Sequence, residues 1–209
     1  MGLGTAPTVQ TYGEVFREND RQIGNLKSFY QTFSSIFAKH VPGITHLGIK
    51  ILYYQLSEGE WERFYRRQVF KIILLTRRNA LRRYTSIKIA MNTRVWLERQ
   101  SQQLDIDQRR ITHDVDRLVE DLRKSQAIDR AFAARFKDWN PAHVVYEEMI
   151  ADPAATFARL GTFLGTSGFD HTQIPLRRQN PEPLDQLISN FDAVAEALHG
   201  TEFEAMLYD

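Results

Sequence analysis

Arg77, Arg78 and Ser86 have the residue types and the spacing of a small phosphate site. The segment Phe70–Thr76 (FKIILLT) predicts a buried strand, and sequence typical of a helix follows from Asn79. In open α/β sheets, ligands bind at the carboxyl ends of strands, where a helix N-terminus offers free backbone N–H groups. Ser86 lies about two helical turns beyond Arg78, so a guanidinium and a hydroxyl could hold one phosphate from two directions. The spacing leaves open the alternative that Ser86 is an ordinary residue of a helix surface.

Basic residues gather around this segment. Residues 66–88 contain eight of them and no acidic residue, whereas the whole 209-residue chain has a net charge of only +1. A focused positive region in a nearly neutral chain favours a small anionic ligand over a long nucleic acid. A nucleic-acid-binding helix over Asn79–Arg99 is therefore a weaker hypothesis. The alternative of a solvated helix face applies most to Arg82 and Arg83.

The elements that would position these residues alternate between strands and helices. Continuous apolar strands separated by helices predict a single α/β domain over residues 1–209, with a parallel sheet covered on both faces. We expect residues Glu14–Ala38 to be helical in parts, with Phe16, Phe29, Phe33 and Phe37 in the core. The strands are predicted at His46–Tyr54, Phe70–Thr76 and Ala142–Glu147, and the helices at Asn79–Arg99, Arg109–Phe136, Asp152 to Gly165 and Pro183 to Gly200.

Composition excludes several kinds of chemistry. The chain has no cysteine, so disulfides, thiolate nucleophiles and Cys-ligated metals are ruled out. Its six histidines show no metal-ligand spacing, so we expect no metal site. Its apolar runs are too short to span a membrane, and residues 1–11 have no signal-peptide pattern. We therefore expect a cytoplasmic protein.

Two longer segments resemble the sulfotransferases that use 3′-phosphoadenosine-5′-phosphosulfate (PAPS). KIILLTRRNALRRYTS (71–86) resembles their 3′-phosphate-binding segment, and VVYEEMIADPAATFARLGTFLG (144–165) resembles their Tyr-Glu segment and the helix after it. Shorter stretches at 12–16, 90–96 and 176–207 are also similar to the family, in its bacterial form. The resemblance implies a three-layer sandwich like that of P-loop NTPases, in which helices flank a parallel sheet.

The resemblance also implies a reaction and a set of roles. The reaction is transfer of a sulfuryl group from PAPS, the co-substrate, to a hydroxyl acceptor that is a carbohydrate or a small molecule, without a metal. Glu14 would be the general base, although it could instead be a carboxylate at a helix N-terminus. Tyr146-Glu147 is expected to support packing at the end of its strand. The nucleotide would be held by Ser86, by Arg77 or Arg78, and by Arg177 and Arg178.

One part of the family pattern has no counterpart. The family begins with a strand and a phosphosulfate-binding loop of the form Arg-Ser/Thr-Gly-Ser/Thr-Ser/Thr, and nothing in this sequence matches that loop. We therefore expect the first strand and loop to be absent, as in a truncated relative. Enzymatic activity is left open for this reason. The alternative is a catalytically inactive binding protein with the sulfotransferase fold, or a fragment.

Overall fold

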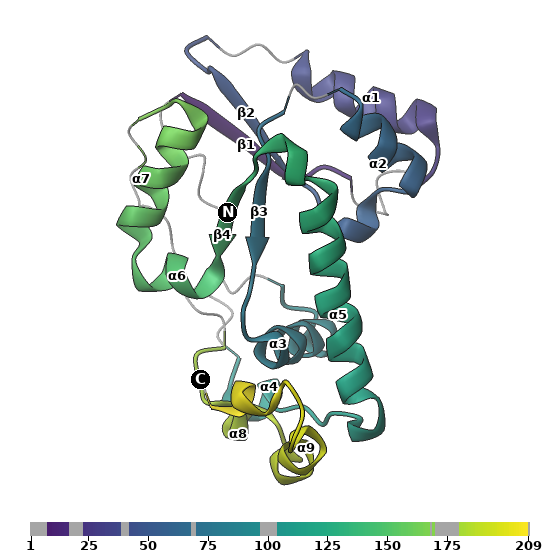
Figure 1. Cartoon of the computed structure of the whole chain (residues 1–209), viewed down its shortest axis with the longest axis vertical. Helices are drawn as coiled ribbons and strands as arrows, with labels where there is room; N and C mark the ends of the chain where they lie inside the picture. The colour runs from purple at the N-terminus through teal and green to yellow at the C-terminus, as the bar shows by residue number, and fades with distance from the viewer. Residues whose placement is uncertain are drawn as a thin grey trace. The chain divides into compact units, whose positions relative to one another are not determined.

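The computed structural model describes residues 8–16, 23–38, 42–67, 70–96, 104–167, 169 and 180–208. These residues form a mixed α/β structure, shown in Figure 1. Its strands are β1 (Val9–Glu14), β2 (His46–Lys50), β3 (Ile73–Thr76) and β4 (Ala142–Val145). Its helices are α1 (Leu26–Phe37), α2 (Glu58–Tyr65), α3 (Ala80–Thr93), α4 (Ile106–Arg109), α5 (Val115–Arg135), α6 (Tyr146–Ala151), α7 (Pro153–Leu164), α8 (Leu184–Leu187) and α9 (Phe191–Leu198), with 3₁₀ turns at Tyr53–Gln55, Lys137–Trp139 and Glu204–Leu207.

The described strands form two small sheets. β1 and β2 pair in parallel, with Val9 opposite His46 and an irregularity before Glu14 and Lys50 pair. β3 pairs with β4, and Figure 1 shows these two strands side by side and pointing the same way. All three predicted strands are present, each shorter than its predicted range. The expectation that they are buried is wrong, because most of their residues are partly exposed and only Val144 among them is buried. The three-layer sandwich stays a prediction.

The chain divides into two compact units. Unit 1 comprises Met1–Leu74, Phe136–Val144 and Glu148–Pro175. Unit 2 comprises Leu75–Arg135, Val145–Glu147 and Leu176–Asp209. The expectation that the chain is a single domain stays a prediction.

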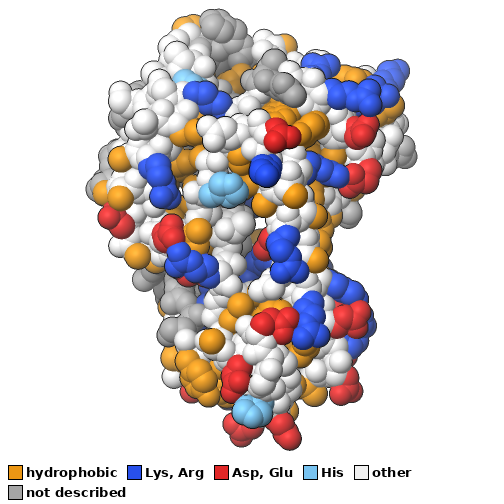
Figure 2. Space-filling model, viewed as in Figure 1, with side chains coloured by type: hydrophobic (Ala, Val, Ile, Leu, Met, Phe, Trp, Pro, Cys, Tyr) orange, Lys and Arg blue, Asp and Glu red, His pale blue; other side chains and the backbone are white. Residues whose placement is uncertain are grey.

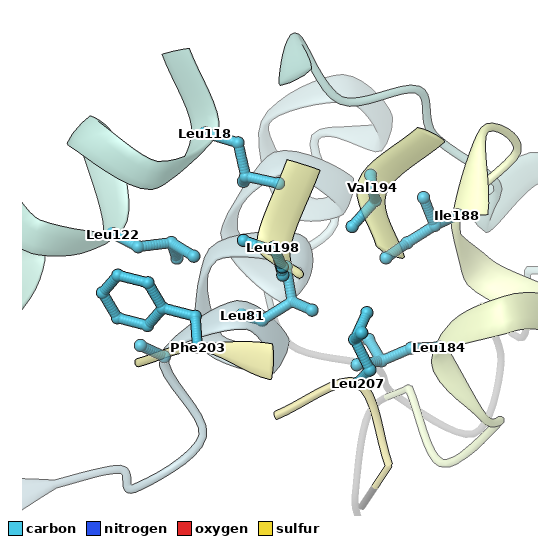
Figure 3. Close-up of a cluster of buried hydrophobic side chains, with 10 residues drawn as sticks. Leu81, Leu118, Leu122, Leu184, Ile188, Val194, Leu198, Phe203 and Leu207 are labelled. Carbon is cyan, nitrogen blue, oxygen red and sulfur yellow. The ribbon is translucent and has the colours of Figure 1, made fainter. Parts of the chain in front are cut away.

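Unit 2 has an aliphatic core. Figure 3 shows the side chains of this core pointing toward one another from α3, α5, α8, α9 and the last 3₁₀ turn. The residues of the cluster are Ala80, Leu81, Leu118, Leu122, Leu184, Ile188, Val194, Leu198, Phe203 and Leu207. In α5 and α9 the apolar residues recur at steps of four, so each helix buries one face.

Three predicted helices of unit 2 are wrong in their bounds. The helix predicted over Asn79–Arg99 is α3, which ends at Thr93 with Arg94 in the left-handed conformation. The helix expected from Arg109 begins at Val115, because Ile111 is extended and forms a bridge with Ile188. The Ile111 N–H donates to the Leu187 carbonyl (2.9 Å), and the Ser189 N–H donates to the Ile111 carbonyl (2.8 Å). This bridge also splits the helix predicted after Pro183 into α8 and α9.

Unit 1 has an aromatic core. Phe16, Phe29 and Phe33 are buried as predicted, and Phe16 stacks on Phe29 with ring centroids 5.6 Å apart. Phe37 is 45% exposed, so its assignment to the core is wrong. Phe29 and Phe33 lie on α1, which begins at Leu26. The Asn25 side chain caps this helix by accepting hydrogen bonds from two backbone N–H groups.

The helix predicted from Asp152 to Gly165 is confirmed as α7, and capping residues mark the ends of α3 and α7. Asn79 caps α3, and Asp152 caps α7 with Pro153 at its first position. α7 ends at Gly165, whose φ of +76° is the left-handed conformation that favours glycine. Among the described residues, no helix is both long enough and apolar enough to cross a membrane.

Candidate functional site

The turn between β3 and α3 gives its two arginines different surroundings. The Arg77 guanidinium lies over the Tyr146 ring, 4.6 Å from the centroid, and its Nε is 3.7 Å from a carboxylate oxygen of Glu147. Its side chain is only 15% exposed. Arg78 is exposed. Of the two candidates, Arg78 is therefore the one whose side chain faces solvent, while Arg77 packs inside unit 2.

Groups of the protein itself occupy the N-terminus of α3. The Glu147 carboxylate accepts hydrogen bonds from the N–H groups of Arg78 (3.0 Å) and Asn79 (3.3 Å). The Asn79 side chain accepts from the Arg82 N–H (2.8 Å), and the Ala80 N–H contacts the Met206 sulfur (3.3 Å). The expectation of free amide groups is thus wrong for these four residues. A phosphate at this turn would have to be held by side chains.

Ser86 lies on α3, two turns beyond Arg78, and is partly exposed. Within the part of the chain that the structure describes, no hydrogen bond involves its hydroxyl. Its neighbour Thr85 is buried, and its Oγ1 lies 3.0 Å from Nε2 of His113. Arg78 therefore lies in the turn before α3 and Ser86 lies on α3 itself, and solvent reaches both side chains.

Arg82 and Arg83 are not a solvated helix face. Arg82 is only 2% exposed, and its guanidinium donates to the carbonyls of Asn180 and Glu182 at 3.0 Å. Arg83 pairs with Asp129 at 2.6 Å. Both tie α3 to the rest of unit 2, so part of the basic run is structural. Figure 2 shows Lys and Arg side chains interspersed with Asp and Glu on the face drawn there.

Arg177 and Arg178 lie outside the described residues. Their predicted role near a nucleotide stays a prediction of the resemblance.

Glu14 lies at the end of β1 in unit 1, so its alternative role at a helix N-terminus is wrong. Its carboxylate forms an ion pair with Lys50 (2.5 Å), which ends β2, and accepts a hydrogen bond from the Gln55 amide (3.3 Å). Glu14 and Lys50 lie side by side because β1 and β2 run parallel, so that the C-terminal ends of both strands are at the same end of the sheet. A partly exposed carboxylate held in this way can accept a proton from a bound hydroxyl group.

Lys50 and Gln55 were missed by reasoning from the sequence. Lys50 carried a usable signal, since it lies within a predicted strand and is followed by apolar residues. Gln55 carried none, because its contact with Glu14 spans 41 residues of sequence. Tyr146 and Glu147 support the end of their strand as expected, through Arg77 and the N-terminus of α3.

Among the described histidines, His113 has the most strongly shifted pKa. Burial, and secondarily the positive charge of Lys88, lower the pKa of His113 from 6.5 to about 4. Its backbone is clamped by Asn190, which accepts from the His113 N–H (3.0 Å) and donates to its carbonyl (2.9 Å). His113 is therefore neutral at physiological pH and acts as a buried partner of Thr85.

Comparisons with models of protein families, with curated proteins and with solved structures find no match for this chain. Among the described residues, no group of three or more His, Asp or Glu side chains is arranged to hold a metal ion.

Proposed function

We propose that this chain is a PAPS-dependent sulfotransferase that acts on a hydroxyl group of a carbohydrate or a small molecule. One observation supports the proposal most. β3 ends at Thr76 and α3 begins at Ala80, so Arg78 lies in a strand-to-helix turn and Ser86 lies on the helix, as the resemblance requires. The proposed cellular location is the cytoplasm.

The proposal assigns the 3′-phosphate to Arg78 and Ser86. Arg78 is preferred to Arg77, because the Arg77 guanidinium already packs on Tyr146 beside Glu147. Since Glu147 fills the backbone donors of the turn, the guanidinium and the Ser86 hydroxyl supply the contacts. These contacts position the donor and do not themselves carry out the chemistry.

The proposal assigns the acceptor chemistry to Glu14 and Lys50. As the acceptor hydroxyl oxygen forms its bond to sulfur, its proton passes to Glu14. The bond between sulfur and the leaving bisphosphate breaks, and the bisphosphate oxygen keeps the electron pair. Lys50, in contact with Glu14, keeps the carboxylate in place.

The test is calorimetric titration of the chain with adenosine 3′,5′-bisphosphate, the reaction's nucleotide product. We expect Arg78→Ala and Ser86→Ala each to weaken binding. Loss of one charge-assisted hydrogen bond is worth about 1.5–3 kcal/mol, or roughly 10- to 150-fold in affinity. The matched control is Arg66→Ala. This substitution also removes an exposed arginine, but Arg66 pairs with Glu62, four residues earlier in the chain, and lies outside the proposed phosphate site.

Nucleotide binding that is lost with Arg78 and Ser86 but kept in the Arg66→Ala variant would support the proposal. Binding that is absent from the folded chain up to millimolar nucleotide would refute it. Sulfate transfer from PAPS then tests Glu14. If Glu14→Gln keeps nucleotide affinity but abolishes transfer, the general-base role stands, whereas a chain that binds nucleotide and never transfers sulfate is the inactive binding protein.

A further inference from the structure

Three large apolar side chains are exposed in one line along α1, and we call them the apolar stripe. Leu26, Tyr30 and Phe37 are 37%, 36% and 45% exposed. Their spacing of four and seven residues places them within about 40° of one another around the helix, along about 16 Å of its length. Apolar residues that are exposed singly are ordinary, whereas an aligned set at the surface marks a site of interaction.

The two rings of the apolar stripe rest on buried neighbours. The Tyr30 ring meets Phe29 edge to face, with centroids 5.5 Å apart, and the Phe37 ring stacks on Phe33 at 5.3 Å. Phe29 and Phe33 are buried in the core of unit 1. The rings are therefore held in place at the surface, and little side-chain entropy remains to be lost when a partner covers them.

Two arginines border the apolar stripe on the side of α2. The Arg63 guanidinium donates a hydrogen bond to the Tyr30 hydroxyl (3.2 Å), and the Arg67 guanidinium lies over the Tyr30 ring, 5.5 Å from its centroid. Both arginines are exposed. The hydrogen bond from Arg63 is the main cause that lowers the pKa of Tyr30, and the positive charges of both arginines add to it. A positive potential thus surrounds the middle of the stripe.

These cations are not neutralised by neighbouring acids that the structure describes. No described carboxylate forms an ion pair with Arg63, Arg67 or Lys27, an exposed residue that lies about one turn before Tyr30 on α1. Like charges four residues apart, as in Arg63 and Arg67, repel each other. An anion brought by a binding partner would relieve this repulsion.

The acidic side chains of α2 are directed elsewhere. Glu58 and Glu62 lie about 100° or more around the helix from Arg63, and Glu62 pairs with Arg66 at 3.1 Å. Glu60 is buried, and its carboxylate accepts hydrogen bonds from backbone N–H groups. The edge of α2 that borders the apolar stripe is therefore positive. Figure 2 shows Lys and Arg side chains next to hydrophobic ones over α1 and α2.

A surface of anionic lipid headgroups matches both features. Apolar side chains can enter the boundary between headgroups and acyl chains, while basic side chains stay beside the lipid phosphates. A small anion would contact the arginines and leave the apolar stripe in water. An acidic polypeptide would match the cations, but it would also need apolar side chains spaced along about 16 Å. A bilayer supplies apolar and anionic groups together over any such length.

We propose that the face of unit 1 formed by α1 and α2 binds the surface of an anionic lipid bilayer. The apolar stripe enters the headgroup region, and Lys27, Arg63 and Arg67 contact lipid phosphates. The chain lies on the bilayer and does not span it. Neither the resemblance nor the proposed function assigns this surface, and its binding does not depend on a nucleotide.

The experiment measures co-sedimentation of the full chain with two kinds of vesicle, without any nucleotide. One kind is pure phosphatidylcholine, and in the other about a third of the lipid is phosphatidylglycerol. We expect binding to the anionic vesicles only, weakening as salt is added. Arg63→Ala and Arg67→Ala should each weaken it about fivefold, which corresponds to about 1 kcal/mol per cation, and the double variant about 25-fold.

Two further variants separate the apolar contribution from general charge. Leu26→Ser removes a third-exposed apolar side chain without changing charge, and it should weaken vesicle binding about two- to fivefold. Arg159→Ala removes an exposed arginine of α7 and is the matched control, expected to bind as the unchanged chain does. If the double arginine variant fails to fold by circular dichroism, Arg63→Gln with Arg67→Gln replaces it.

Weaker binding in the arginine and Leu26→Ser variants, with binding kept by Arg159→Ala, would support the proposal. Absence of binding to anionic vesicles at low salt, or equal binding by the double arginine variant, would overturn it. Unchanged binding by Leu26→Ser would reduce the surface to simple attraction of anions and overturn the apolar contact. Inorganic phosphate at millimolar concentration that displaces the chain would show a free-phosphate site instead. Binding of polyglutamate without binding of vesicles would show an acidic polypeptide partner.

Discussion

His113 makes the stability of unit 2 depend on pH in a predictable direction. The side chain is 4% exposed and packs on the Tyr84 ring, with centroids 5.2 Å apart, as well as contacting Thr85. Burial lowers the pKa of His113 to about 4 in the folded chain, from 6.5. The folded state therefore binds the proton less well than the unfolded state does. The free energy of unfolding is therefore unaffected by His113 above pH 6.5 and decreases as the pH drops from about 6.5 toward 4.

The size of the effect follows from the two pKa values. A tenfold difference in proton affinity is worth about 1.4 kcal/mol, so at pH 5 the lowered pKa would cost at most about 2 kcal/mol. Residual contact of the imidazole ring with solvent reduces this cost, so we expect the free energy of unfolding to fall by about 1–2 kcal/mol at pH 5. Asp and Glu side chains with ordinary pKa values change little between pH 7.5 and pH 5.

Urea unfolding of the unchanged chain and of His113→Gln, each at pH 7.5 and pH 5, measures the effect. We expect the unchanged chain to lose about 1–2 kcal/mol more than the variant over this interval. His143→Gln, at an exposed histidine, is the control and should lose as much as the unchanged chain. Equal losses in the unchanged chain and in His113→Gln would refute the reasoning. An NMR titration of the imidazole that gives a pKa near 6.5 would refute it independently.

Two further predictions concern packing and backbone conformation. Leu198 is fully buried in the core of unit 2, so Leu198→Ala should lower the free energy of unfolding by about 2–5 kcal/mol, measured by urea denaturation. Gly165→Ala should destabilise the chain by about 1–2 kcal/mol because of its positive φ, whereas Gly59→Ala, inside α2 with open space around it, should stabilise it by up to about 1 kcal/mol. Thermal melting of the two glycine variants should therefore shift in opposite directions, and a shift in the same direction would contradict the argument.

Local signals in the sequence determined much of the secondary structure. Asn79, Asp152 and Gly165 mark helix ends through contacts within a few residues, so their effect can be read without knowing the fold. The strands at β2, β3 and β4 were predictable because each lies in a short, largely apolar run of sequence, although most of their residues are partly exposed in the structure. The sequence likewise placed Arg78 and Ser86 on one strand-turn-helix segment, which the structure has, and phosphate binding there stays a prediction.

Long-range contacts decided the rest. The bridge between Ile111 and Ile188 shortens one predicted helix and splits another, because tertiary pairing outweighs a helical pattern in the sequence. Glu147 reaches the N-terminus of α3 across 69 residues of sequence, and burial turns Arg82 from an apparent surface charge into a structural one.

The same division holds for the candidate chemistry. The types and spacing of residues in the sequence indicated Ser86 with Arg77 or Arg78 as a candidate phosphate site, and the resemblance implied Glu14 as the base for proton transfer. Only the tertiary structure placed Lys50 and Gln55 on Glu14. These contacts join separate segments of the chain, so they exist only once β1 and β2 have paired and the 3₁₀ turn has docked.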